Sequence, residues 1–129
     1  MSTDLGIATL LVRTVNHQDQ YFNCKLVFVN LESVLGSKGY EIQSAETRQD
    51  GRGTAPALRI GTSYQQRLNV QIDTRLRLVD SNDTYFKHRL VFDNLEDNLK
   101  THGFVVGSCS TREDGQHSPL AIRVTLSRR

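Results

Sequence analysis

The chain has 129 residues and a mass of 14.6 kDa, a size that suits one compact domain. Hydrophobic residues make up 37% of it and charged residues 23%, which excludes a disordered chain, and its apolar runs stay well below the roughly 18 residues of a membrane span. The formal net charge of +2, from 16 basic and 14 acidic residues, does not by itself indicate a polyanionic partner.

Residues 11–63 and 75–127 correspond to each other at a constant offset of 64. At 21 of the 53 paired positions the two residues are identical, with no gap, whereas chance would give roughly 6% identity. The sequence therefore predicts a tandem duplication, folded as a fused pseudo-dimer about an approximate two-fold axis. The longest shared stretches are Leu26-Val27-Phe28 with Leu90-Val91-Phe92, and Asn30-Leu31-Glu32 with Asn94-Leu95-Glu96.

The first unit opens with a predicted hairpin. Phe22, Leu26 and Phe28 fall on one parity of residues 21–28, and this alternation indicates a half-buried strand. The polar residues before it are typical of a turn. In order, the predicted elements of this unit are strands at 10–15 and 21–28, a short helix that ends before Gly39, and strands at 40–48 and 57–62.

The second unit repeats this order. Asp93 is predicted to cap its helix, with Glu96 completing a capping box, and Gly103 suits the left-handed position after the helix. A helix that began as early as Tyr85 would place Asp93 on its apolar stripe, so a strand is favoured there. The predicted elements are strands at 76–79 and 85–92, a helix from Asp93, and strands at 104–112 and 120–126.

The predicted fold class is α+β, a tandem duplication of a ββαββ unit forming a pseudo-two-fold antiparallel-sheet domain with two short helices. Unit 1 covers residues 1–63, a connecting strand covers 64–74, and unit 2 covers 75–129. The connecting segment alternates Leu68, Val70 and Ile72 with polar neighbours, as a strand does. Each unit alone is too small for a comfortable core, so both are expected to form one compact domain.

Basic and aromatic side chains gather on the strand faces opposite the predicted core. Such a face suits single-stranded nucleic acid, because guanidinium and ammonium groups bind phosphates and a tyrosine stacks on a base with about 1–3 kcal/mol. A slip of one residue in the strand parity would turn this face inward. The predicted nucleic-acid-binding residues are Arg13, Tyr21, Lys25, Arg59, Arg75, Arg77, Tyr85, Lys87, Arg89 and Arg123.

The leading functional prediction is thus a non-enzymatic binding protein with single-stranded nucleic acid as partner. One alternative is a structural or protein-interaction module that uses two pseudo-equivalent patches, with a protein partner or a second copy of the chain. Basic residues are also common on solvent-facing strands without any binding role. No catalytic residue and no cofactor is predicted, since the sequence has no phosphate loop, nucleophile elbow or His-Glu-x-x-His motif.

A third alternative is a ligand-binding or metal-binding fold with its site between the repeats. Cys24 and His88 occupy equivalent positions on the inward parity, where a Cys–His pair could bind zinc if the two sites met at the axis. Two ordinary core side chains explain the same pattern, and no metal site is predicted.

The chain is expected to be cytoplasmic and without a membrane partner. Its start, Met1-Ser2-Thr3-Asp4, is polar and acidic, unlike a secretory signal peptide. Cys24 and Cys109 lie at non-equivalent positions of the two units, whereas a disulfide framework would be expected to repeat with them. Reduced cysteines are therefore predicted.

Overall fold

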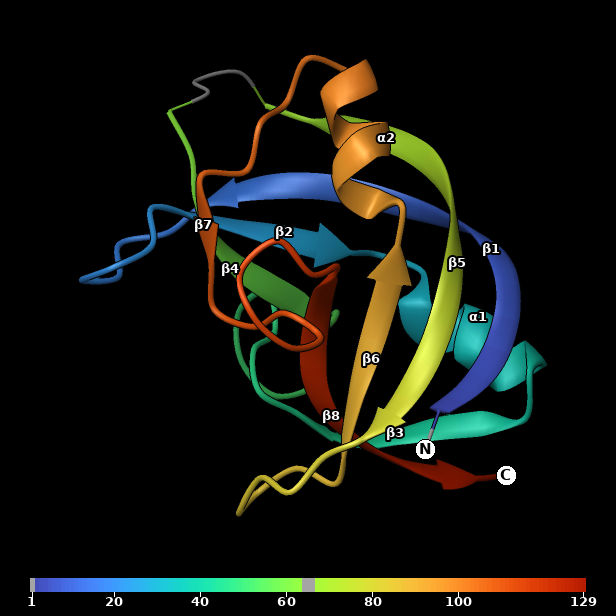
Figure 1. Cartoon of the computed structure of the whole chain (residues 1–129). Helices are drawn as coiled ribbons and strands as arrows, with labels where there is room; N and C mark the ends of the chain where they lie inside the picture. Colours follow the sequence, from blue (N-terminus) through green and yellow to red (C-terminus); the bar gives the residue numbers. More distant parts are fainter. Residues whose placement is uncertain (1, 64–66) are drawn as a thin grey trace.

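A computed structural model describes residues 2–63 and 67–129 (Figure 1). Within these residues the chain forms two short helices and one curled antiparallel sheet of eight strands, which confirms the predicted α+β class. Neither helix of the described residues is long and apolar enough to cross a membrane. The elements are β1 (Ser2–Asn16), β2 (Cys24–Phe28), α1 (Leu31–Ser37), β3 (Tyr40–Ala45), β4 (Ala57–Gly61), β5 (Asn69–Asp80), β6 (His88–Asp93), α2 (Leu95–Thr101), β7 (Ser108–Cys109) and β8 (Leu120–Arg128).

The two longest strands, β1 and β5, pair antiparallel at the centre of the sheet. Leu10 on β1 and Leu76 on β5 are fully buried, and each alternates with more exposed neighbours, as a strand with one face on a core requires. Of the segment predicted to connect the two units, the part from Asn69 onward belongs to β5, and residues 64–66 lie outside the described residues.

The strand order of the sheet is β3-β8-β6-β5-β1-β2-β4-β7. If each of β1 to β4 is exchanged with its counterpart among β5 to β8, the same order results, read from the other edge of the sheet. The pairing register behaves in the same way. Val12 faces Phe28, and 64 residues later Leu76 faces Phe92. Every strand of one half therefore has its counterpart at the same place in the other half.

The third strands of the two halves are exchanged. β3 pairs with β8, which belongs to the second half, and β7 pairs with β4, which belongs to the first. Each half thus completes the sheet of the other. The core is accordingly continuous through the molecule, as predicted for a shared core.

Phe28 and Phe92 meet in the middle of this core. Their rings stack with centroids 4.4 Å apart and an angle of 13° between the planes, and both side chains are fully buried. The helices contribute leucines one turn apart, Leu31 and Leu35 on α1, and the corresponding pair on α2. The aromatic pair is therefore contributed equally by both halves.

The predicted helix ends are confirmed, but the predicted helix start is wrong. Gly39 and Gly103 follow the helices with φ of +92° and +80°, the left-handed conformation that glycine adopts without strain. At the start of α2, Asn94 occupies the cap position and makes no side-chain cap bond to the described residues. The Asp93 carboxylate instead accepts hydrogen bonds from Arg77, a charged partner stronger than the backbone N–H groups of the helix.

Several predicted strands are shorter than expected. The strand predicted at 40–48 ends at Ala45, and the strand predicted at 85–92 begins at His88. Residues 104–112 form a strand only over Ser108–Cys109, which pairs with Ile60 and Gly61 of β4. The strand predicted at 21–28 begins at Cys24, because Tyr21 belongs to the preceding turn. The start of β2 is thus set by a local turn, whereas β7 depends on β4, a partner that is distant in sequence.

Candidate interaction surface

The predicted basic face is covered by loops. Lys25 leaves β2 on the side opposite the core, and its Nζ donates hydrogen bonds to the carbonyls of Arg48 and Gln49, both at 3.1 Å. In the second half Arg89 donates to the carbonyls of Arg112 and Glu113 at 3.1 and 2.5 Å. The carbonyls of these loops therefore already accept hydrogen bonds from the Lys25 and Arg89 groups that would otherwise be available to a phosphate.

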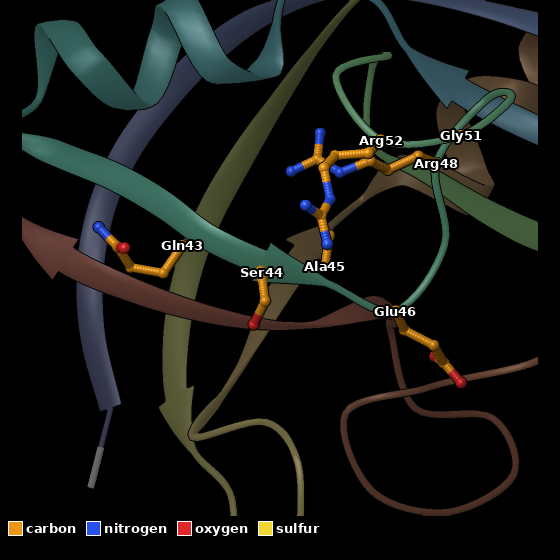
Figure 2. Close-up of a pocket in the computed structure, with 7 residues that line it drawn as sticks. All are labelled: Gln43, Ser44, Ala45, Glu46, Arg48, Gly51 and Arg52. Carbon is orange, nitrogen blue, oxygen red and sulfur yellow. The ribbon is translucent and has the colours of Figure 1, made fainter.

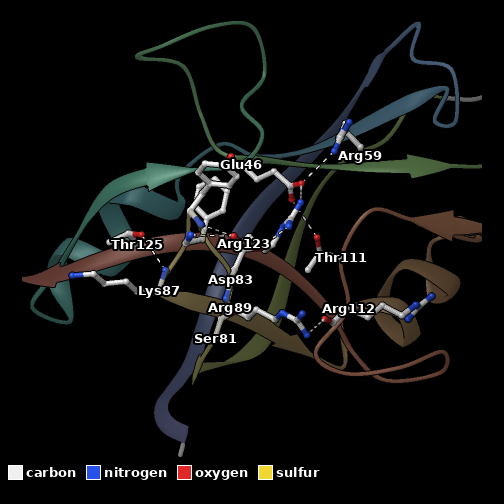
Figure 3. Close-up of polar contacts among 12 residues, drawn as sticks. Glu46, Arg59, Ser81, Asp83, Lys87, Arg89, Thr111, Arg112, Arg123 and Thr125 are labelled. Atoms are coloured by element: carbon white, nitrogen blue, oxygen red, sulfur yellow. Dashed lines mark hydrogen bonds and ion pairs between the residues drawn. The ribbon is translucent and has the colours of Figure 1, made fainter.

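A chain of ion pairs joins the two halves across this face. Arg59 on β4 and Arg123 on β8 both bind the carboxylate of Glu46, which Figure 3 shows between their guanidinium groups. The outer ends of the chain are Asp19, 3.1 Å from Arg59, and Asp83, 2.7 Å from Arg123. The chain is thus symmetric about one shared acid.

Glu46 has no acidic counterpart in the second half, where the equivalent residue is Ser110. Its second carboxylate oxygen accepts a hydrogen bond from the Thr111 hydroxyl at 3.2 Å (Figure 3). Because one carboxylate neutralises two equivalent arginines, the two halves depend on a single side chain at this point. It is an asymmetric element in an otherwise symmetric arrangement.

Arg77 and Arg13 occupy equivalent positions with different partners. Arg77 forms paired hydrogen bonds with Asp93 at 2.9 and 3.0 Å and with Glu113 at 2.5 and 2.7 Å. These bonds raise the pKa of Arg77, and the Arg77 guanidinium lowers the pKa of Glu113 against the opposing effect of burial. Arg13 donates instead to the neutral amide oxygen of Gln49 at 2.5 Å.

The two tyrosines of the predicted face are highly exposed. Tyr21 and Tyr85 are 74% and 81% exposed at the tips of the β1–β2 and β5–β6 hairpins. Each backbone N–H donates to an aspartate two residues earlier, Asp19 at 2.9 Å and Asp83 at 2.7 Å. The Tyr21 N–H lowers the pKa of Asp19, opposed by burial, and the Arg59 guanidinium lowers it further. The ion-pair chain therefore also fixes the hairpin tips.

Six of the ten predicted residues are thus brought together in pairs rather than on one open platform. Arg59 and Arg123 share Glu46, Arg13 and Lys25 converge on Gln49, and Arg77 and Arg89 converge on Glu113. Arg75 is exposed and binds Asp4 at 2.6 Å, while Lys87 is exposed beside Tyr85. The tyrosines lie on separate hairpins.

Sequence reasoning missed the acids that neutralise this face. A signal for two of them was present, because Asp19 recurs as Asp83 at the same offset as Arg59 recurs as Arg123. Glu46 offered no such signal, since it does not recur. Its role depends on the exchange of β3, which carries it next to β8 of the other half.

The Cys–His candidate does not form a site in the described residues. Cys24 is a buried free thiol, and burial raises its pKa, which keeps it protonated. His88 is half-buried, and its Nδ1 accepts a hydrogen bond from the backbone N–H of Leu126 at 3.2 Å. Within residues 2–63 and 67–129 no group of three or more His, Cys, Asp or Glu side chains could hold a metal ion.

Replacing Glu46 with glutamine should lower the free energy of unfolding by about 1–2 kcal/mol, because two half-buried arginines lose their shared charged acceptor and solvent screens part of the loss. Urea unfolding measures the change. Glu41→Gln, at an exposed position of β3, is the matched control and should shift stability by less than about 0.5 kcal/mol. Equal effects of both substitutions would contradict a bridging role for Glu46.

Comparisons of the chain with protein-family models, with curated proteins and with solved structures find no match.

Proposed function

We propose that the chain is a non-enzymatic protein-interaction module in which two equivalent tyrosine-tipped hairpins hold one protein partner. The observation that carries this proposal is the pair Tyr21 and Tyr85, which are highly exposed, equivalent by the offset of 64 and fixed by hydrogen bonds to Asp19 and Asp83. Exposed aromatic side chains in a pre-formed backbone lose little entropy on binding and are common anchors of protein interfaces.

The proposal includes an origin by tandem duplication of a ββαββ unit. The 21 identities at one offset and the matching strand registers support it. A duplicated module presents the same anchor twice, so a partner with two similar surfaces would bind both. Joining two weak contacts in this way raises the overall affinity without a new kind of contact. A reducing, cytoplasmic location fits the free thiols of Cys24 and Cys109.

The charges around the tyrosines favour a protein over a nucleic acid. Phosphate recognition requires basic groups with free donors. Arg59 contacts the Tyr21 hairpin through Asp19, and it also binds Glu46. A nucleic acid would have to displace these carboxylates, whereas a protein partner needs only the apolar ring and the Tyr21 hydroxyl.

The proposal is tested by affinity capture from cell extract with quantitative mass spectrometry, followed by binding of the purified partner. We expect a partner that binds the unaltered chain, binds each of Tyr21→Ala and Tyr85→Ala more weakly, and is lost from the double variant. Val105→Ala, which removes a different exposed apolar side chain, is the matched control and should bind normally. The proposal would be contradicted if the double variant captured as much partner as the unaltered chain, or if nuclease treatment abolished the capture.

Single-stranded nucleic acid is the second candidate, and it rests on Lys87, an exposed cation two residues from the exposed Tyr85. This arrangement allows a base to stack on the ring while the ammonium group binds a phosphate. Titration with single-stranded DNA and RNA at two salt concentrations tests it. Tight binding that weakens with salt, and that Lys87→Gln and Tyr85→Ala reduce, would favour this candidate over a protein partner.

A further inference from the structure

A cavity of about 620 Å³ opens between β3 and the loop that follows it (Figure 2). Its lining residues include Ser44, Glu46, Arg48 and Arg52. Small-molecule sites commonly have volumes of roughly 300–1,000 Å³. The cavity is therefore large enough for a ligand bigger than a simple ion.

Arg48 and Arg52 differ in how many contacts their side chains make with the rest of the protein. The Arg48 side chain is 19% exposed, and its Nη1 donates to the Thr54 carbonyl at 2.6 Å and to Glu32 at 3.4 Å. Both of these hydrogen bonds are made by the same nitrogen of the guanidinium group. Arg52 is exposed and forms no ion pair within residues 2–63 and 67–129. In Figure 2 the two guanidinium groups lie close together over the end of β3.

The acid in the lining does not cancel this positive charge. The oxygens of Glu46 already accept from Arg59, Arg123 and Thr111. In Figure 2 its side chain points away from the guanidinium groups of Arg48 and Arg52. The charge of Glu46 is thus directed to the ion-pair chain. Glu32, 3.4 Å from Arg48, offsets part of the charge of that arginine, whereas Arg52 has no ion pair among residues 2–63 and 67–129 and keeps its positive charge at the cavity.

The second half contains the equivalent cavity, which lacks the pair of arginines with available donors. It has a volume of about 400 Å³, and Gln116 stands where the first half has Arg52. Its remaining guanidinium, Arg112, is bound by both oxygens of Glu96 at 2.6 and 3.3 Å, and these bonds raise the pKa of Arg112. An arginine held this way has fewer free donors, so the anion-binding features are specific to the first half.

We propose that the cavity at β3 binds the phosphoryl group of a small phosphorylated molecule, or free phosphate, between Arg48 and Arg52. Guanidinium groups pair with phosphate oxygens through two parallel N–H donors each, and two of them balance the charge of a phosphate dianion. The remaining volume accommodates the rest of a phosphate ester. This site goes beyond the proposed function, because it shares no residue with the tyrosine hairpins.

Binding is measured by isothermal titration calorimetry at low salt with inorganic phosphate, ribose 5-phosphate, adenosine monophosphate and adenosine. We expect saturable binding of the phosphate-bearing compounds and none of adenosine. A phosphate ester that binds more tightly than inorganic phosphate identifies an ester as the ligand, and equal affinities identify free phosphate. Either result supports the phosphoryl site.

Arg52→Gln installs the residue that the second half already carries and should weaken phosphate binding by about tenfold or more. Lys100→Gln removes an equal charge from the exposed surface of α2 and is the control, with an expected change below about twofold. Because Arg52 is exposed, both variants should unfold at the same urea concentration as the unaltered chain. Absence of saturable phosphate binding, or equal effects of the two variants, would overturn the proposal.

Discussion

Replacing Phe28 with alanine should lower the free energy of unfolding by about 3–5 kcal/mol, the usual cost of removing a buried phenylalanine. Phe28 is fully buried and stacks on Phe92, so the truncation leaves a cavity lined by residues of both halves. Domains of this size are commonly stable by about 5–15 kcal/mol, so the loss is a large share of the total.

The same variant tests whether the halves unfold together. β3 and β7 are exchanged between them, so neither half keeps a complete sheet when the other unfolds. We therefore expect a single transition in urea, seen at the same midpoint by circular dichroism and by tyrosine fluorescence. Val29→Ala, at a partly exposed neighbouring position, should cost less than about 0.5 kcal/mol. Two separate transitions would contradict the shared core.

Replacing Arg77 with methionine should cost about 2 kcal/mol near neutral pH, because Asp93 and Glu113 lose their paired hydrogen bonds while solvent screens the remaining charges. Methionine keeps much of the side-chain volume and removes the charge. Chemical unfolding of the two proteins at pH 7 measures the difference.

The cost of this substitution should shrink in acid. Arg77 lowers the pKa of folded Glu113, so this pair contributes stability above the ordinary pKa of a glutamate, and the contribution is lost as the pH falls through the lowered value. The difference between the two proteins should therefore be largest near neutral pH and smallest near pH 3. Acid-sensitive groups that both proteins retain, such as Asp19, cancel in this comparison.

Arg13→Met is the matched control for this effect, because Arg13 is equivalent to Arg77 but donates to the neutral Gln49. Its cost should be smaller and should not depend on pH between 3 and 7 in the way that the Arg77 difference does. A constant difference between the unaltered chain and Arg77→Met over this range would contradict the role assigned to the Arg77–Glu113 pair.

Features that depend on neighbouring residues followed from the sequence. The alternation of Leu26 and Phe28 with Lys25 placed the apolar face of β2 on the core, because side chains of a strand point alternately to opposite sides. Gly39 and Gly103 marked the helix ends, because the left-handed backbone there favours glycine. The α+β class rests on such local patterns.

Tertiary structure, by contrast, decides whether the cations of the basic face are open to solvent or paired with other groups of the chain. The sequence placed Arg59 and Arg123 on strands but carried no information on their partners. Glu46 reaches both arginines because β3 is exchanged onto the other half. Asp93 binds Arg77 rather than capping its own helix, because the β5–β6 register places Val91 opposite Arg77 and thus makes Asp93, two residues further on, a diagonal neighbour on the same face. Charge partners are selected by distance in space, and a pattern along the chain does not contain that distance.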